Sequence, residues 1–119
     1  MKENVIKNKS FDFALQIIQL YKYLADVKKE FVLSKQVLRS GTSIGALIRE
    51  AEQAESKADF IHKLSISLKE ANETDYWIEL LFKSKYIDDL QYNTIHADLN
   101  EILRLLISII KTSKARKDD

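Results

Sequence analysis

The most constraining feature of this chain is how little it contains that would stop a helix. It has no proline and only two glycines in 119 residues. Proline and glycine are the residues that most often interrupt helices or form turns. Apolar residues recur at the three- and four-residue spacing of an amphipathic helix along most of the chain. We therefore predict an all-α fold, a single antiparallel up-down-up-down four-helix bundle over residues 1–119.

Residues that cap helices divide the chain into four segments. The predicted helix starts are Ser10, Ser34, Ser56 and Asp88, and the last two are followed three residues later by Asp59 and Gln91, as in a capping box. The predicted apolar stripe of the first helix comprises Phe11, Ala14, Leu15, Ile18, Tyr21 and Ala25. We expect the polar ends, at about 1–9 and 112–119, to be flexible.

Composition excludes several classes of protein. The chain has no cysteine, so it forms no disulfide, thiol nucleophile or zinc–thiolate site. Its formal charge of +1 argues against a strongly basic nucleic-acid binder, although a local basic face is compatible with it. The N-terminal residues lack the apolar core of a signal peptide, and the apolar stretch 99–110 is too short to cross a bilayer. We expect a cytoplasmic protein without membrane contact.

Both glycines fall in one helical segment, at Gly41 and Gly45. The apolar pattern runs through them without losing phase, so we predict one continuous helix, with a break at residues 40–43 as the alternative. Each glycine costs about 0.5–1 kcal/mol relative to alanine inside a helix. Close approach of another backbone would offset that cost, either within the bundle or between copies of the chain.

The fourth helix has an unusually wide apolar arc. Between residues 99 and 110 the polar side chains occupy one narrow strip, and the rest of the circumference is leucine or isoleucine. A helix that packs only within a small bundle needs a narrower stripe. Self-association is one explanation, and deep burial of this helix within one chain is the other. The residues predicted to pack closely or to join copies are Gly41, Gly45, Ile44, Ile48, Leu105 and Ile109.

Few residues point to catalysis or metal binding. Bundles that hold two metal ions need inward carboxylates and Glu-x-x-His on two helices, and the nearest match here is Asp59-x-x-His62. No phosphate-binding glycine loop or catalytic triad pattern is recognisable. We expect neither cofactor nor metal, and no enzymatic activity.

The acidic residues of the third predicted helix are better explained by the register between the second and third helices than by catalysis. If the second and third helices turn around near residue 56, Arg39 lies opposite Glu73, with Glu70 one turn away, and Glu50 lies opposite His62. We predict that Arg39 pairs with Glu70 or Glu73 and fixes register. The predicted structural set is Arg39, Ser43, Glu50, Glu70 and Glu73.

The segment QVLRSGTSIGALIREAEQAES, residues 36–56, carries a family resemblance. It resembles the helix-two signature of the bacterial four-helix-bundle family, also called the 23S rRNA-intervening sequence protein family, which reads approximately Q-hydrophobic-x-R-S-x-x-S-I-x-A-N-I-x-E-G. The matching residues are Gln36, Arg39, Ser40, Ser43, Ile44, Ala46, Ile48 and Glu50. Leu47 stands where the family usually has Asn, and Ala51 where it usually has Gly. Flanking segments extend the similarity over about residues 10–110.

The resemblance implies a ring-shaped homopentamer and relatives encoded within inserts of ribosomal RNA genes. It also implies kinship with an accessory protein of retroelements that binds nucleic acid and a reverse transcriptase. We therefore expect a non-enzymatic, oligomeric protein associated with structured RNA or RNA–DNA. Its candidate contacts are Lys28, Lys29, Lys35, Arg49, Lys57, Lys63 and Lys69. Ordinary solvated lysines, and a protein–protein scaffold without nucleic-acid contact, remain the alternatives.

Overall fold

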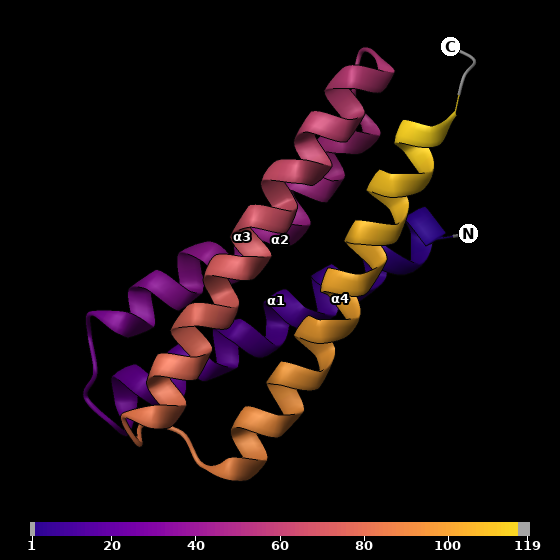
Figure 1. The fold of residues 1–119 in the computed structure, drawn as a ribbon. Coiled ribbons are helices and arrows are strands. Elements are labelled where there is room, and N and C mark those ends of the chain that lie inside the picture. The colour runs from indigo at the N-terminus through magenta and orange to yellow at the C-terminus, as the bar shows by residue number, and fades with distance from the viewer. Residues whose placement is uncertain (1, 117–119) are drawn as a thin grey trace.

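The computed structural model describes residues 2–116 as four long α-helices. They are α1 (Lys2–Asp26), α2 (Leu33–Glu52), α3 (Lys57–Lys83) and α4 (Asp89–Ala115). Each helix packs against two neighbours, so that α1 contacts α2 and α4, and α3 contacts the same two helices. The α1–α2 and α3–α4 loops lie at one end of the molecule, and the α2–α3 loop lies at the other (Figure 1). This arrangement confirms the predicted up-down bundle and makes the α1–α2 and α3–α4 pairs opposite sides of it.

The helix caps follow from local sequence in three of the four helices. The Ser56 hydroxyl accepts a hydrogen bond from the Asp59 N–H at 3.0 Å, as predicted. The Asp88 carboxylate accepts from the Gln91 N–H at 2.8 Å, and the Gln91 side chain accepts from the Asp88 N–H at 2.9 Å, which completes the predicted capping box. Helix α2 begins at Leu33, one residue before the predicted Ser34, which is buried and does not cap it; the Glu30 carboxylate, which precedes the helix, accepts from the N–H groups of residues 32–34.

The predicted start of the first helix is wrong. α1 begins at Lys2, so residues 2–9 are helical, and Ser10 is a buried mid-helix residue whose hydroxyl donates to the Lys7 carbonyl at 3.1 Å. A serine that bonds back to its own helix need not act as a cap. Helix α4 likewise continues to Ala115, and the rest of the predicted flexible tail, 117–119, lies outside the described residues.

The predicted stripe of α1 is also not its core face. The buried apolar residues of this helix are Ile6, Phe13, Ile17, Leu20 and Leu24. Phe11 and Leu15 are each 49% exposed. Helix α1 therefore carries two apolar faces, and the sequence pattern alone selected the outer one.

The glycines of α2 allow α1 to approach closely within the same chain. Helix α2 runs continuously through both, so the alternative of a break at residues 40–43 is wrong. A Cβ atom built on Gly41 would lie 2.8 Å from Ile17 Cγ1, and one on Gly45 would lie 3.2 Å from Ser10 Oγ. Ile44 and Ile48 of the same helix are buried in the core.

Small polar residues bring α2 and α3 together. The hydroxyl of Thr74 bonds to that of Ser40 at 2.9 Å, and the Ser67 hydroxyl donates to the Ile44 carbonyl at 2.9 Å. Ser40, Ser67 and Thr74 are all fully buried. Buried hydroxyl groups need partners, and these pairings satisfy them across the helix contact.

The wide apolar arc of α4 is mostly covered within the chain. Leu99, Ile102, Leu106, Ile109 and Ile110 are buried, and Leu103 and Leu105 are half-buried. Only Ile107 of the arc is strongly exposed, at 53%. Ile109 therefore packs inside one copy, and the larger exposed apolar face belongs to α1.

Candidate nucleic-acid interface

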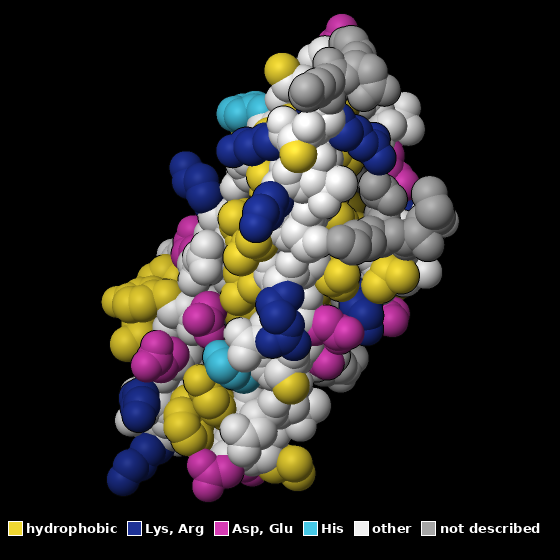
Figure 2. All heavy atoms as spheres, turned by 45° about the vertical axis from the view of Figure 1, so that its right-hand side comes forward, with side chains coloured by type: hydrophobic (Ala, Val, Ile, Leu, Met, Phe, Trp, Pro, Cys, Tyr) yellow, Lys and Arg dark blue, Asp and Glu magenta, His cyan; other side chains and the backbone are white. Residues whose placement is uncertain are grey.

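The seven candidate cations do not form one patch. Lys28 and Lys29 lie in the α1–α2 loop, Lys35 in the first turn of α2, Arg49 in its last turn, and Lys57, Lys63 and Lys69 along the first half of α3. Three of them therefore lie at the loop end, Arg49, Lys57 and Lys63 lie toward the other end, and Lys69 lies near the middle of α3. On the side turned forward in Figure 2, basic side chains are scattered among acidic and apolar ones.

The cations beyond the α1–α2 loop are largely engaged. Lys63 pairs with Glu50 at 3.1 Å, so the partner of Glu50 is Lys63 and not His62, which is exposed. The Arg49 guanidinium lies 5.2 Å from the centre of the Phe11 ring, in a cation–π contact. The Lys57 ammonium donates to the Arg116 carbonyl.

A groove at the loop end brings together lysines from two distant segments. Lys28 of the α1–α2 loop meets Lys83 and Lys85 from the end of α3, in a groove of about 650 Å³. The groove is also lined by Tyr23, Phe82 and Tyr86, and by the acidic residues Asp88 and Asp89. The sequence prediction missed Lys83 and Lys85; antiparallel topology places both loops at this end but does not by itself put these two lysines beside Lys28.

Two lysines at this end have a backbone conformation that favours glycine. Among residues 2–116, the non-glycine residues with positive φ are Lys29, at 56°, and Lys85, at 70°. An L-residue in this region costs about 1 kcal/mol. Lys85 occupies the position after the α3 cap, where the N–H groups of Lys85 and Tyr86 bond back to the carbonyls of Phe82 and Leu81. Glycine is the usual residue there, so lysine at this position adopts the left-handed conformation at a cost in conformational free energy.

The predicted contact of Arg39 is present at the edge of the bundle. Its guanidinium donates to Glu70 at 3.2 Å and also to Glu73. The hydrogen bond with Glu73 raises the pKa of Arg39. The pKa of Glu73 is lowered by hydrogen bonds from the Trp77 indole, at 2.9 Å, and from Arg39. Ser43 donates to the Arg39 carbonyl at 2.6 Å. The role of this cluster in register stays a prediction.

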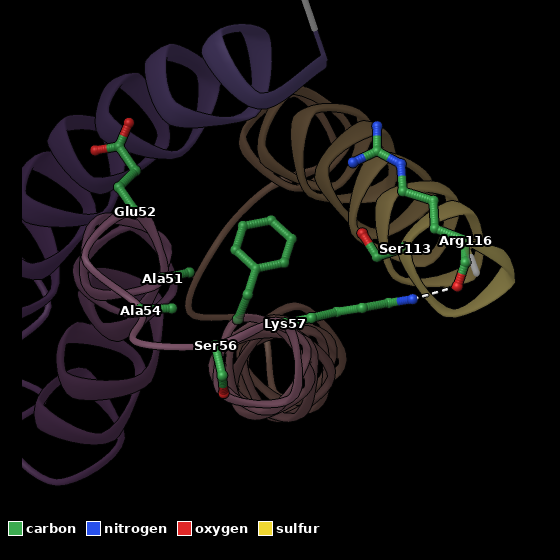
Figure 3. A pocket seen from close by; sticks show the side chains of 8 residues that line it. Ala51, Glu52, Ala54, Ser56, Lys57, Ser113 and Arg116 are labelled. Carbon is green, nitrogen blue, oxygen red and sulfur yellow. Dashed lines mark hydrogen bonds between the residues drawn. The ribbon is translucent and has the colours of Figure 1, made fainter. Parts of the chain in front are cut away.

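A second hollow, of about 580 Å³, lies at the opposite end (Figure 3). Lys57 extends across it to the Arg116 carbonyl, whereas Glu52 points away from Lys57. Glu52 pairs instead with Lys7 at 3.3 Å. The Ser56 hydroxyl is occupied as the cap of α3. Acid–base catalysis requires polar groups that converge on a common point, and these groups do not converge.

An aromatic stack connects α3 and α4. The ring of Tyr92 stacks between Phe82, with centroids 4.3 Å apart, and His96, at 5.0 Å. His96 Nε2 lies 3.3 Å from an Asp75 carboxylate oxygen. Burial, reinforced by the nearby carboxylates of Asp75 and Glu79, raises the pKa of Tyr92. Within residues 2–116, no group of three or more His, Asp or Glu side chains is arranged to hold a metal ion.

The outer face of α1 is an apolar feature of the α1–α2 side, and Val27, Phe31 and Val32 of the adjoining loop are exposed as well. We call this face of α1 the α1 outer stripe; it comprises Phe11, Ala14, Leu15, Ile18, Tyr21 and Ala25, of which Phe11 and Leu15 are exposed and the others half-buried. A helix that is apolar on two faces is typically buried on both. Phe11 and Leu15 each stay about half exposed, although the Arg49 guanidinium lies over the Phe11 ring.

The fold and the surface define a small four-helix-bundle protein whose first helix, α1, is apolar on two faces. Residues 2–108 match the family model described as 23S rRNA-intervening sequence protein, and the chain belongs to that family. A crystal structure from Bacteroides thetaiotaomicron VPI-5482, described as a protein of unknown function from the S23 ribosomal protein family, is 65% identical and superposes with a TM-score of 0.92. That match covers 93% of this chain and 99% of the other.

No curated protein matches the chain. In the part of the chain that the structure describes, none of the helices combines the length and apolar character needed to cross a bilayer.

Proposed function

We propose that this chain is a non-enzymatic protein that assembles into a homo-oligomer and associates with nucleic acid, of which structured RNA linked to ribosomal RNA is the best candidate. The observation that carries the proposal is the α1 outer stripe, because an apolar face left partly exposed within one chain favours contact with another. The family description supports the link to ribosomal RNA.

A second copy is the occupant that fits the α1 outer stripe. The stripe is flanked by the exposed cations Lys22 and Arg49. The opposite side of the bundle, between α3 and α4, carries the exposed Ile107 and, about three helical turns away beside His96, the carboxylate of Asp75 with that of Glu79. Apolar groups with cations on one face and apolar groups with carboxylates on the other are complementary.

Contact between opposite faces has a consequence for symmetry. It is heterologous, and a heterologous contact that closes on itself forms a ring. A ring is consistent with the homopentamer that the family resemblance implies. Each copy would add the same weakly basic surface, so affinity for a polyanion would rise by multivalency although the formal charge of one chain is only +1.

The proposal is tested by titrating the purified protein with a labelled structured RNA at several salt concentrations. We expect binding whose logarithmic affinity falls linearly with the logarithm of salt concentration, because phosphate contacts release counterions. No retardation of any RNA, or an affinity independent of salt, would refute the association with nucleic acid.

A protein–protein scaffold is the second candidate, and exposed apolar residues away from α1 favour it. Leu90 is 74% exposed and Tyr76 is 56% exposed. Affinity capture from lysate, with and without nuclease, separates the two candidates. Partners retained after nuclease treatment, a reverse transcriptase among them, would favour the scaffold; partners lost with nuclease would favour nucleic acid.

A further inference from the structure

The groove at the loop end combines the two kinds of group that a nucleotide needs. Lys28, Lys83 and Lys85 supply cations for phosphate, and Tyr23 and Tyr86 supply aromatic walls for a base. Its volume of about 650 Å³ lies within the range of small-ligand sites. We infer that this groove receives one nucleotide of a single-stranded RNA segment, which places the proposed nucleic-acid contact at the loop end of the bundle.

The backbone gives an independent reason to single out this end. Lys29 and Lys85 both have positive φ, although glycine would adopt that conformation without strain. Strained residues persist where the surrounding structure holds them, and they cluster at functional sites. Lysine at both positions places positive charge at this end of the bundle, with Lys85 lining the groove and Lys29 next to Lys28 in the chain.

The two acidic residues that line the groove limit how the nucleotide lies. The Asp88 carboxylate is used in the cap of α4, where it accepts from the Gln91 N–H at 2.8 Å. Asp89 is exposed in the first turn of the same helix. A carboxylate repels phosphate and accepts hydrogen bonds from the exocyclic amines of bases. Phosphate therefore belongs beside the lysines, and an amine-bearing base edge belongs beside Asp89.

Charge-matched variants test the site. The probe is a fluorescein-labelled single-stranded RNA of about ten nucleotides, followed by anisotropy. The loop-end variant replaces Lys28, Lys83 and Lys85 by Gln, and its control replaces Lys69, Lys111 and Lys114 by Gln, exposed lysines that line neither the groove nor the α1 outer stripe, so both lose three cations. In about 0.1 M salt we expect the loop-end variant to bind about 100-fold more weakly, with a salt slope smaller by about 2, and the control to bind within about threefold of the parent.

Lys85→Gly isolates the contribution of one side chain from folding. Because glycine suits the φ of 70°, this variant should melt no lower than the parent, yet bind the RNA about fivefold more weakly. Unchanged binding by Lys85→Gly, or an equal loss in the control triple variant, would overturn the groove as the site.

The outcomes also separate this inference from the proposed function on which it rests. If the parent binds RNA and the loop-end variant binds it equally well, the proposed function stands and the groove is wrong. If the parent binds no RNA at any salt concentration, both fall. Displacement of the RNA by oligoglutamate at equal charge would reassign the groove to an acidic protein.

Discussion

Replacement of Gly41 by alanine tests the close contact between α1 and α2. The added methyl group would lie 2.8 Å from Cγ1 and 2.9 Å from Cγ2 of Ile17. Both atoms are attached to the Ile17 Cβ, so any change of the χ1 rotamer leaves a carbon in at least one of the two clashing positions, and α1 itself must shift. Overpacking of this kind costs about 1–3 kcal/mol, whereas alanine gains about 1 kcal/mol over glycine as a helix former. We expect a net loss of about 1 kcal/mol, which lowers the melting temperature by about 4 °C.

The control for this prediction is a second substitution at the contact. Ile17→Ala removes both clashing atoms, so Gly41→Ala should become stabilising by about 0.5–1 kcal/mol in that background. Ile17→Val keeps both Cγ positions and should leave the penalty in place. Urea denaturation of the four combinations of Gly41→Ala and Ile17→Ala, at one protein concentration, measures the coupling. An equal effect of Gly41→Ala in the parent and Ile17→Ala backgrounds would refute the contact.

Three further predictions address the ion pair, the cap and the outer face. The pKa of Glu73 is held below its ordinary value of 4.5, so its contribution to stability is present above that value and is lost as the pH falls through the depressed pKa. Between about pH 5 and pH 3 the parent should therefore lose more free energy of unfolding than Glu73→Gln. Parallel curves of unfolding free energy against pH would contradict this. Burial raises the pKa of Glu30, but hydrogen bonds from backbone N–H groups outweigh burial and leave that pKa lowered. Glu30→Ala should therefore reduce the free energy of unfolding by about 1 kcal/mol in urea denaturation, against almost nothing for substitution of an exposed acid elsewhere. The double variant Phe11→Ser, Leu15→Ser should lower the native mass without loss of helical circular dichroism. The control Leu90→Ser, at a 74% exposed site, should leave the native mass unchanged. A lower mass for the control and an unchanged mass for the double variant would remove the α1 outer stripe as an interface.

The architecture was predictable because its determinants are local. The missing prolines, the capping pairs at Ser56 and Asp88, and the unbroken phase through Gly41 all act within a few residues of the chain. The contact of Arg39 with Glu70 and Glu73 was predictable for a related reason, since antiparallel helices that share a short turn have a nearly fixed register.

The core face of α1 was not predictable from periodicity because this helix has two apolar faces of similar spacing. The stripe through Phe11 and Leu15 and the stripe through Phe13 and Ile17 satisfy the same three- and four-residue rule. Packing against Gly41 of α2 decides between them, and that contact joins residues far apart in the chain. Lys83 and Lys85 were missed for a similar reason, because their proximity to Lys28 depends on two loops that meet only in the folded bundle.

The central claim is that copies of this chain associate through the outer face of α1. Native mass in solution, measured by light scattering coupled to size exclusion over a range of concentrations, tests it most directly. We predict a discrete species heavier than the 13.8 kDa of one chain, and a mass about five times that value if the ring is a pentamer. A well-folded species of 13.8 kDa that persists when the protein is concentrated would contradict the account.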